Sequence, residues 1–112
     1  MGDEDELLAS LELIGVSPGG DERPFTVGVG RPRRDSSGCW FCPTRWHDFD
    51  KAKPIYGEDS LQALCLGLAL IRARLQDFLG KGGRLLAAED RHEFSREEFE
   101  AYFSKIGSAG PT

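Results

Sequence analysis

Residues 59–80 read DSLQALCLGLALIRARLQDFLG, and they contain the clearest helical pattern of the chain. Asp59 and Gln62 have the spacing of a capping box, in which two side chains satisfy the free N–H groups at the start of a helix. Apolar side chains then recur at steps of three and four: Leu61, Leu64, Leu68, Ile71, Leu75 and Phe78. This pattern predicts a helix over about 60–80 that buries this stripe and ends at the glycines of 80–83.

The first half of this helix also carries apolar residues outside the stripe, among them Cys65, Leu66 and Leu70. Gly67 costs about 1 kcal/mol relative to alanine inside a helix, so it indicates that another element comes close there. We expect that neighbour to be a sheet or a second subunit. The chain is accordingly expected to be a monomer or a homodimer through the helix at 60–80.

Alternating apolar residues predict an antiparallel hairpin before the helix. Period-two patterns over 7–16 and 25–29 flank a run of turn-forming residues at 17–21. After the helix, residues 84–86 have an extended pattern. Ser95 and Glu98 form a second capping box, which opens a short final helix whose apolar face carries Phe99, Tyr102, Phe103 and Ile106.

Two further strands are expected between the hairpin and the helix. The stretch 39–46 is rich in aromatic residues, which favour strands, and it follows a polar loop. Because proline donates no ladder hydrogen bond, this strand should bend or lie at an edge near Pro43. A short strand within 51–56 is confined by Pro54 to an edge or an irregular position.

These elements together predict an α+β fold in one domain over residues 1–106, followed by a disordered tail at 107–112. The sheet is expected to be antiparallel with three or four strands, one long helix packed across one face, and a short C-terminal helix.

Composition narrows the classes of function. The chain has 112 residues and a formal net charge of −5. Because a negative charge repels phosphate backbones and anionic lipids, neither nucleic acid nor a membrane is an expected partner. The acidic start lacks the features of a secretory signal, and three cysteines form no regular disulfide framework. We therefore expect a cytoplasmic protein with reduced thiols.

Cys39 and Cys42 have the Cys-x-x-Cys spacing of zinc and dithiol sites. A metal would need further ligands, of which His47 is the nearest along the chain. Residues three apart in a strand point to opposite faces, however, and cannot share one ion. The pattern favours two ordinary strand thiols, and a zinc or redox site at Cys39, Cys42 and His47 is the alternative.

Other polar groups predict no catalytic residue and no cofactor. His47, Asp48 and Asp50 are adjacent polar residues without an identifiable partner elsewhere in the chain. The arginines at 31, 33 and 34 are interrupted by proline and followed by Asp35, which favours a soluble loop over a phosphate site. The glycine-rich run 80–83 follows a helix, unlike a phosphate-binding loop.

The function expected from these observations is protein binding by an accessory or regulatory module. Catalysis is the less favoured possibility, and it would need a polar pocket between sheet and helix around His47, Asp48 or His92. Trp40 and Trp46 would be natural anchors if they were exposed on an open sheet face. An acidic domain of this size would, for example, suit the neutralisation of a basic toxin.

Residues 54–64 read PIYGEDSLQAL. With Gly-Arg-Pro at 30–32 and Gly-Arg-Leu-Leu at 83–86, this string resembles a family of small bacterial proteins known only as an uncharacterised domain. The resemblance extends over about 11–86 and implies a compact bacterial cytosolic protein without assigned catalytic residues. Its residues have structural roles, since Gly57 permits a turn and Asp59 and Gln62 cap the helix.

Overall fold

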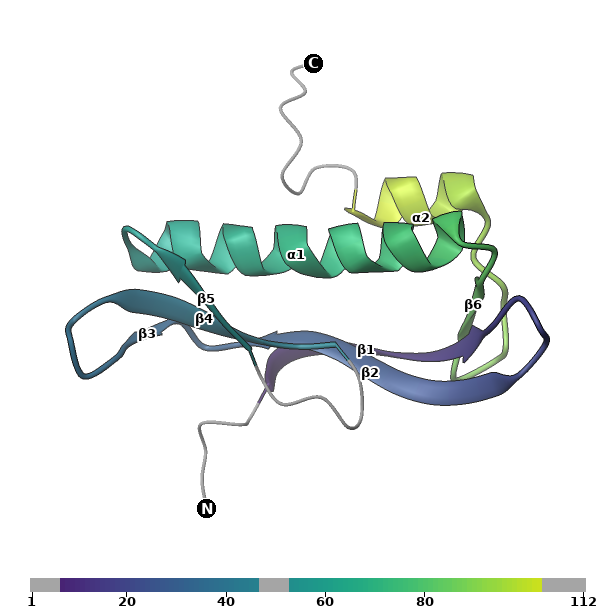
Figure 1. Cartoon of the computed structure of the whole chain (residues 1–112), viewed down its shortest axis with the longest axis horizontal. Coiled ribbons are helices and arrows are strands. Elements are labelled where there is room, and N and C mark those ends of the chain that lie inside the picture. Colours follow the sequence, from purple (N-terminus) through teal and green to yellow (C-terminus); the bar gives the residue numbers. More distant parts are fainter. Residues whose placement is uncertain (1–6, 47–52, 104–112) are drawn as a thin grey trace.

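The computed structural model describes residues 7–46 and 53–103, and Figure 1 shows a long helix lying across one face of a sheet. The elements in chain order are β1 (Leu7–Val16), β2 (Glu22–Gly30), β3 (Arg33–Arg34), β4 (Trp40–Arg45), β5 (Lys53–Gly57), α1 (Ser60–Gly80), β6 (Arg84–Ala87) and α2 (Arg96–Phe103). The expected α+β class, with an antiparallel sheet, one long helix and a short C-terminal helix, is confirmed. The tail expected at 107–112 lies outside the described residues.

The described strands form one antiparallel sheet in which β5, β4, β2, β1 and β6 lie side by side in this order. The two-residue β3 pairs with β4 beyond the end of β2, so the described part of the sheet has six strands. An isolated bridge between Leu86 and Glu93 adds a seventh segment beside β6. The expectation of three or four strands was wrong. β3 and the bridge at Glu93 are too short to produce a visible alternation, and the extended segment at 84–86 joins the sheet as β6.

The β1–β2 hairpin and the edge position of β5 are confirmed. Leu11 pairs with Val27 and Leu13 with Phe25 across the hairpin. β5 pairs with β4 on one side, and no described strand lies on its other side. Pro54 is therefore in an edge strand, where its missing N–H leaves few hydrogen bonds unmade.

Pro43, by contrast, lies in an interior strand, so of the two alternatives expected near it, a bend or an edge position, the edge position does not hold. β2 pairs with β4 as far as Val29 and Thr44, and β3 resumes the pairing at Arg33 and Phe41. Three residues on the β2–β3 side therefore face two on β4, which is a bulge. Pro43 lies opposite this break in the ladder, so the sheet accommodates a residue that cannot donate.

The cap and the end of α1 lie where the sequence predicted them. The Asp59 carboxylate accepts a hydrogen bond from the Gln62 N–H at 2.8 Å, and the Gln62 side chain accepts one from the Glu58 N–H at 2.7 Å. Gly82 follows the helix with a φ of 96°, a left-handed conformation that glycine adopts without strain.

The face that α1 turns toward the sheet agrees with the expected stripe only in part. Ile71 and Leu75 are buried as expected, and Leu64, Leu68 and Phe78 pack against the core while only partly buried. The other buried residues of α1 are Ala63 and Gly67, whereas Leu61 is 69% exposed. The close approach expected at Gly67 is confirmed, since a Cβ there would lie 3.1 Å from the Cys42 sulfur. Small residues bring the first half of α1 so near the sheet that leucines fit only at its flanks.

The core lies between α1 and the sheet and is closed by α2. Its buried members come from both layers: Leu13, Val27, Val29, Cys42, Ala63, Ile71, Leu75, Leu85 and Phe99. Phe99 belongs to α2, which begins with the expected capping box between Ser95 and Glu98. Ile106, the last residue of the expected apolar face, lies outside the described residues.

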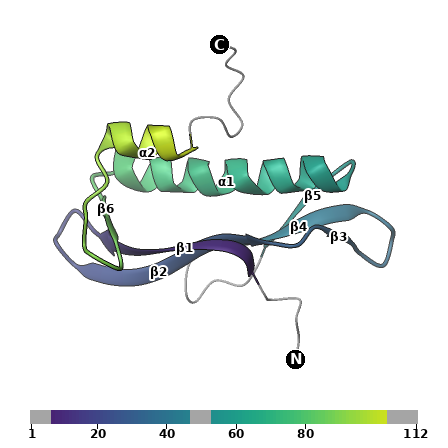
Figure 2. The same cartoon turned by 180° about the vertical axis from the view of Figure 1, so that it is seen from behind.

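One face of the sheet, called here the uncovered face, has none of the described helices over it. The views in Figure 1 and Figure 2 place α1 and α2 on the same side, with α2 beside the C-terminal half of α1. Neither described helix has the length and apolarity needed to cross a membrane.

Candidate binding surface

The two tryptophans expected to act as anchors lie on the helix side of the sheet. Trp40 alternates along β4 with Cys42 and Thr44, both of which are buried beneath α1. Trp46 follows the strand, packs against the core and lines a groove with Phe78 of α1. Both tryptophans are half-buried, and neither is on the uncovered face.

The uncovered face instead carries a row of side chains across β3, β4 and β5. The guanidinium carbon of Arg33 lies 5.1 Å from the centre of the Phe41 ring, and the rings of Phe41 and Tyr56 lie 5.8 Å apart. These residues are paired directly across neighbouring strands, so their side chains share one face. We call Arg33, Phe41 and Tyr56 the arginine–aromatic row, of which Tyr56 is 50% exposed.

Asp35 fastens the turn between β3 and β4 to this row. Its Oδ1 accepts hydrogen bonds from the Ser37 N–H at 2.9 Å, the Ser37 hydroxyl at 2.7 Å and the Cys39 N–H at 3.0 Å. Its Oδ2 accepts one from the Tyr56 hydroxyl at 3.0 Å. The bond from the Ser37 hydroxyl, followed by that from the Cys39 N–H, lowers the pKa of Asp35 to about 2. The same carboxylate raises the pKa of Tyr56, mainly by accepting its hydrogen bond.

The other face of the same hairpin repeats the pairing of arginine with an aromatic ring. Arg34 pairs with Trp40 across the ladder, and its guanidinium carbon lies 5.1 Å from the centre of the Trp40 ring. Within the described part of the chain, Arg31, Arg33 and Arg34 form no ion pair. The hairpin therefore concentrates unneutralised positive charge at one end of the sheet.

The residues of the alternative metal or redox site occupy different environments. Cys39 is exposed in the turn, whereas Cys42 is fully buried and donates its S–H to the Gly30 carbonyl at 3.5 Å. Burial raises the pKa of the Cys42 thiol. His47 lies outside the described residues, and among those described no group of three or more His, Cys, Asp or Glu side chains could hold a metal ion. Cys42 thus serves as a core side chain that satisfies a carbonyl beside the bulge.

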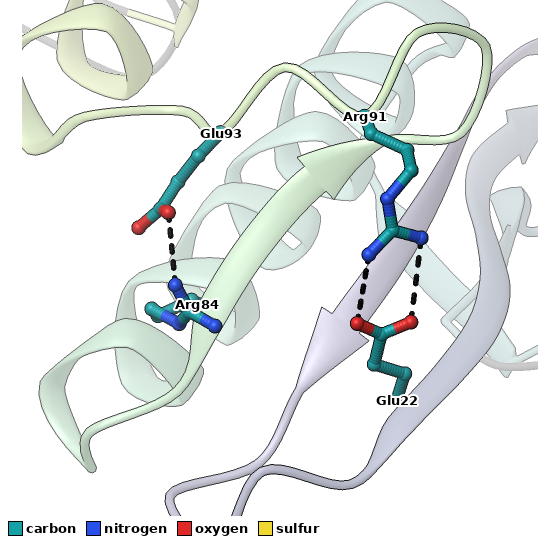
Figure 3. Close-up of polar contacts among 4 residues, drawn as sticks. All are labelled: Glu22, Arg84, Arg91 and Glu93. Carbon is teal, nitrogen blue, oxygen red and sulfur yellow. Dashed lines mark hydrogen bonds and ion pairs between the residues drawn. The ribbon is translucent and has the colours of Figure 1, made fainter.

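A separate charged cluster joins the end of the sheet to the segment that precedes α2 (Figure 3). Arg91 donates two hydrogen bonds to Glu22, at 3.3 and 2.8 Å, and Arg84 pairs with Glu93 at 3.1 Å. The bond from Arg91 lowers the pKa of Glu22. Two arginines here face two glutamates, so the cluster fastens chain segments and leaves no excess charge for a ligand.

Sequence reasoning considered the arginines at 31, 33 and 34 but did not single out Phe41 or Tyr56. The alternation with Cys42 was a usable signal, because it places Phe41 on the face opposite the core. Tyr56 carried no such signal, since its place beside Phe41 depends on the β4–β5 register.

The family model described as Domain of unknown function (DUF6968) matches residues 14–96. This range contains the arginine–aromatic row, α1 and the charged cluster. No curated protein and no solved structure matches the chain. The expected resemblance to an uncharacterised domain is confirmed, and the chain belongs to the family Domain of unknown function (DUF6968).

Proposed function

We propose that this protein is a small, non-catalytic accessory or regulatory module that binds another protein through the arginine–aromatic row. The observation that carries the proposal is the position of Arg33, Phe41 and Tyr56 on the sheet face that no described helix covers. Arginine and tyrosine are enriched among the side chains that contribute most to binding at protein interfaces. Trp40, stacked with Arg34 on the reverse of the hairpin, would extend this surface around its end.

The row is also held in place before any partner arrives. Its three side chains stand on paired strands, and Tyr56 is tethered to Asp35 through its hydroxyl. A side chain that is already ordered loses less conformational entropy on binding. This surface is therefore better prepared for association than a set of mobile surface side chains would be.

A bacterial origin and a cytoplasmic location belong to the same proposal. The acidic composition and the three free cysteines support a reducing compartment. The oligomeric state is proposed as monomer or homodimer through the helix at 60–80, whose exposed leucines include Leu61 and Leu66.

The test is quantitative affinity capture with the full chain, comparing Tyr56→Ala with Leu61→Ala. Both changes remove a large exposed apolar side chain, from the row and from α1 respectively. We expect a specific partner to be retained by wild type and by Leu61→Ala and to be lost from Tyr56→Ala, with circular dichroism confirming that both variants fold. Equal recovery of every partner by Tyr56→Ala and wild type would overturn the proposal.

Native mass spectrometry of chain purified without chelator tests the alternative. One zinc ion per chain would favour a metal site at Cys39, Cys42 and His47 over the binding proposal. The same spectrum separates the monomer from the homodimer.

A further inference from the structure

The arginine–aromatic row combines positive charge with apolar surface, and this combination specifies the chemistry of its ligand. We infer that the row binds an acidic segment of a partner protein, an inference that rests on the proposed function. In this complex an aspartate or glutamate side chain pairs with Arg33 while a neighbouring apolar side chain packs on Phe41 and Tyr56.

The local charge is opposite to that of the whole molecule. The chain has a formal net charge of −5, which alone would suit a basic partner. Three arginines elsewhere are paired with glutamates: Arg72 with Glu100, Arg84 with Glu93 and Arg91 with Glu22. Single arginines such as Arg23 also form no ion pair in the described chain, but the segment 31–34 differs in carrying three of them within four positions. Those at 31, 33 and 34 form no ion pair in the described chain, so a carboxylate from outside would meet charge that is not yet compensated.

The acid nearest to these arginines along the chain is not available to neutralise them. Asp35 already accepts three hydrogen bonds at Oδ1 and one at Oδ2, all from the turn and from Tyr56. Its carboxylate therefore serves to shape the surface, and Arg33 keeps its charge for a ligand.

The stacking of Arg33 leaves its hydrogen-bond donors free. A guanidinium group that lies over an aromatic ring contacts the ring with its flat face, whereas its N–H groups point outward in the plane. The Arg33 guanidinium carbon lies 5.1 Å from the Phe41 ring centre, and the side chain makes no hydrogen bond or ion pair within the described part of the chain. Its N–H groups are thus available to donate two parallel hydrogen bonds to one carboxylate.

The turn beside the row favours a carboxylate over a phosphate group. Phosphate sites commonly use several free backbone N–H groups in a loop or at the start of a helix. In this turn the N–H groups of Ser37 and Cys39 are already donated to Asp35. The start of α1 is likewise capped by its own Asp59. The hydrogen-bond donors that remain on this surface are arginine side chains, and their geometry matches the carboxylate of an aspartate or glutamate.

The test is an NMR titration of the ¹⁵N-labelled full chain with two short peptides blocked at both ends. One carries glutamates around a central phenylalanine, and the other carries glutamines in place of the glutamates. The variants are Arg33→Gln and, as a matched control, Arg23→Gln, because Arg23 is an exposed arginine at the far end of β2 with no ion pair in the described structure. Inorganic phosphate is added as a competitor.

We expect the glutamate peptide to shift the amide signals of residues 33–41 and Tyr56. Loss of a charge-assisted pair should weaken its binding about tenfold in Arg33→Gln, whereas Arg23→Gln should change it by less than about twofold. The acidic-segment inference would be overturned by equal affinity for the two peptides or by signal shifts centred on other arginines. An unaltered affinity in Arg33→Gln, or full displacement of the peptide by equimolar phosphate, would overturn it as well. Partner capture that still depends on Tyr56 would in those cases leave the proposed function standing.

Discussion

Asp35 organises more of the candidate surface than any other single side chain described. It closes the β3–β4 turn, orients the Tyr56 hydroxyl and remains ionised because it receives hydrogen bonds from four donors. Its charge is compensated locally, so the neighbouring arginines keep theirs. In the sequence Asp35 has the features of an ordinary loop aspartate, yet in the fold it controls both the shape and the charge of the row.

The substitution Asp35→Asn should make stability depend differently on pH. The pKa of Asp35 is lowered from 3.8 to about 2 in the fold, so the ionised carboxylate stabilises the native state above the higher value, and this contribution disappears as pH falls toward the lower one. The difference in urea midpoint between wild type and Asp35→Asn should be constant above pH 3.8 and shrink below it. A difference that stays unchanged down to about pH 2 would contradict this assignment.

Gly57 is required for space rather than for backbone conformation. A Cβ at this position would lie 2.5 Å from the Ala63 backbone nitrogen, which cannot move without displacing α1. We expect Gly57→Ala to lower the free energy of unfolding by about 1–3 kcal/mol, the usual cost of overpacking.

Gly80→Ala is the matched control in the same denaturation experiment. A Cβ at Gly80 meets no other atom within 4 Å, and alanine favours the helix by up to about 1 kcal/mol over glycine. The unfolding free energy should therefore be unchanged or slightly raised. Similar losses in the two variants would show that the helix does not approach the sheet at Gly57.

Among the elements, α1 departs most from its sequence pattern. Both its termini and its caps match the prediction, and Ile71 and Leu75 are buried as expected. In the first half of the helix, however, Ala63 and Gly67 are buried rather than the leucines of the stripe. The start of the helix lies against β4 and β5 through small residues, and larger side chains fill the wider gap toward its end. A helix that is apolar on most sides has several faces it can bury, and the shape of the sheet selects among them.

Truncation of Leu61 distinguishes the observed face of α1 from the expected one, and Leu75, which belongs to both faces, is its buried reference. Leu75 is fully buried and Leu61 is 69% exposed. Leu75→Ala should cost about 2–5 kcal/mol of unfolding free energy, and Leu61→Ala should stay within about 0.5 kcal/mol of wild type. Thermal or urea unfolding measures the change in unfolding free energy of both variants. An equal loss in Leu61→Ala and Leu75→Ala would show that Leu61 is buried, as the leucine stripe predicts.

At the scale of the whole molecule, the charged cluster of Figure 3 joins one end of the sheet to the segment that precedes α2. Glu22 opens β2, whereas its partner Arg91 is 69 positions later, in the turn after β6. The pair joins segments that are distant along the chain. Its exposure to solvent limits its contribution to the free energy of unfolding. Its main effect should be on local opening of the segment 84–94.

The substitution Glu22→Gln tests that local role. Removing the charge weakens the bidentate bond to Arg91, so amide hydrogen exchange should accelerate at Ala87 and Phe94, whose N–H groups bond within this segment. The midpoint of global unfolding should hardly change. Exchange rates identical to wild type at these two amides would show that the ion pair does not fasten the segment.

Much of the fold was accessible from the sequence because its signals lie in residue types and spacings that are close along the chain. The caps at Asp59 and Ser95, the β1–β2 hairpin and the close approach at Gly67 all follow from short-range patterns. The edge position of Pro54 follows from its missing donor. These are local rules of hydrogen bonding and backbone geometry, and the surrounding fold did not override them.

The candidate site was accessible only in part. The arginines at 31, 33 and 34 were visible in the sequence, but their neighbours Phe41 and Tyr56 were not, since the row joins three strands. Trp40 and Trp46 were conspicuous by residue type alone, and the register places them on the helix side.

Local sequence thus established which segments become helix or hairpin, because each requires only neighbours within a few positions. Three-dimensional packing determined the number of strands, the side of α1 that is buried, and the proximity of Arg33, Phe41 and Tyr56. The physical reason is that strand register and helix docking are set by contacts between distant segments, and a change of one position in register would turn each side chain to the opposite face of the sheet.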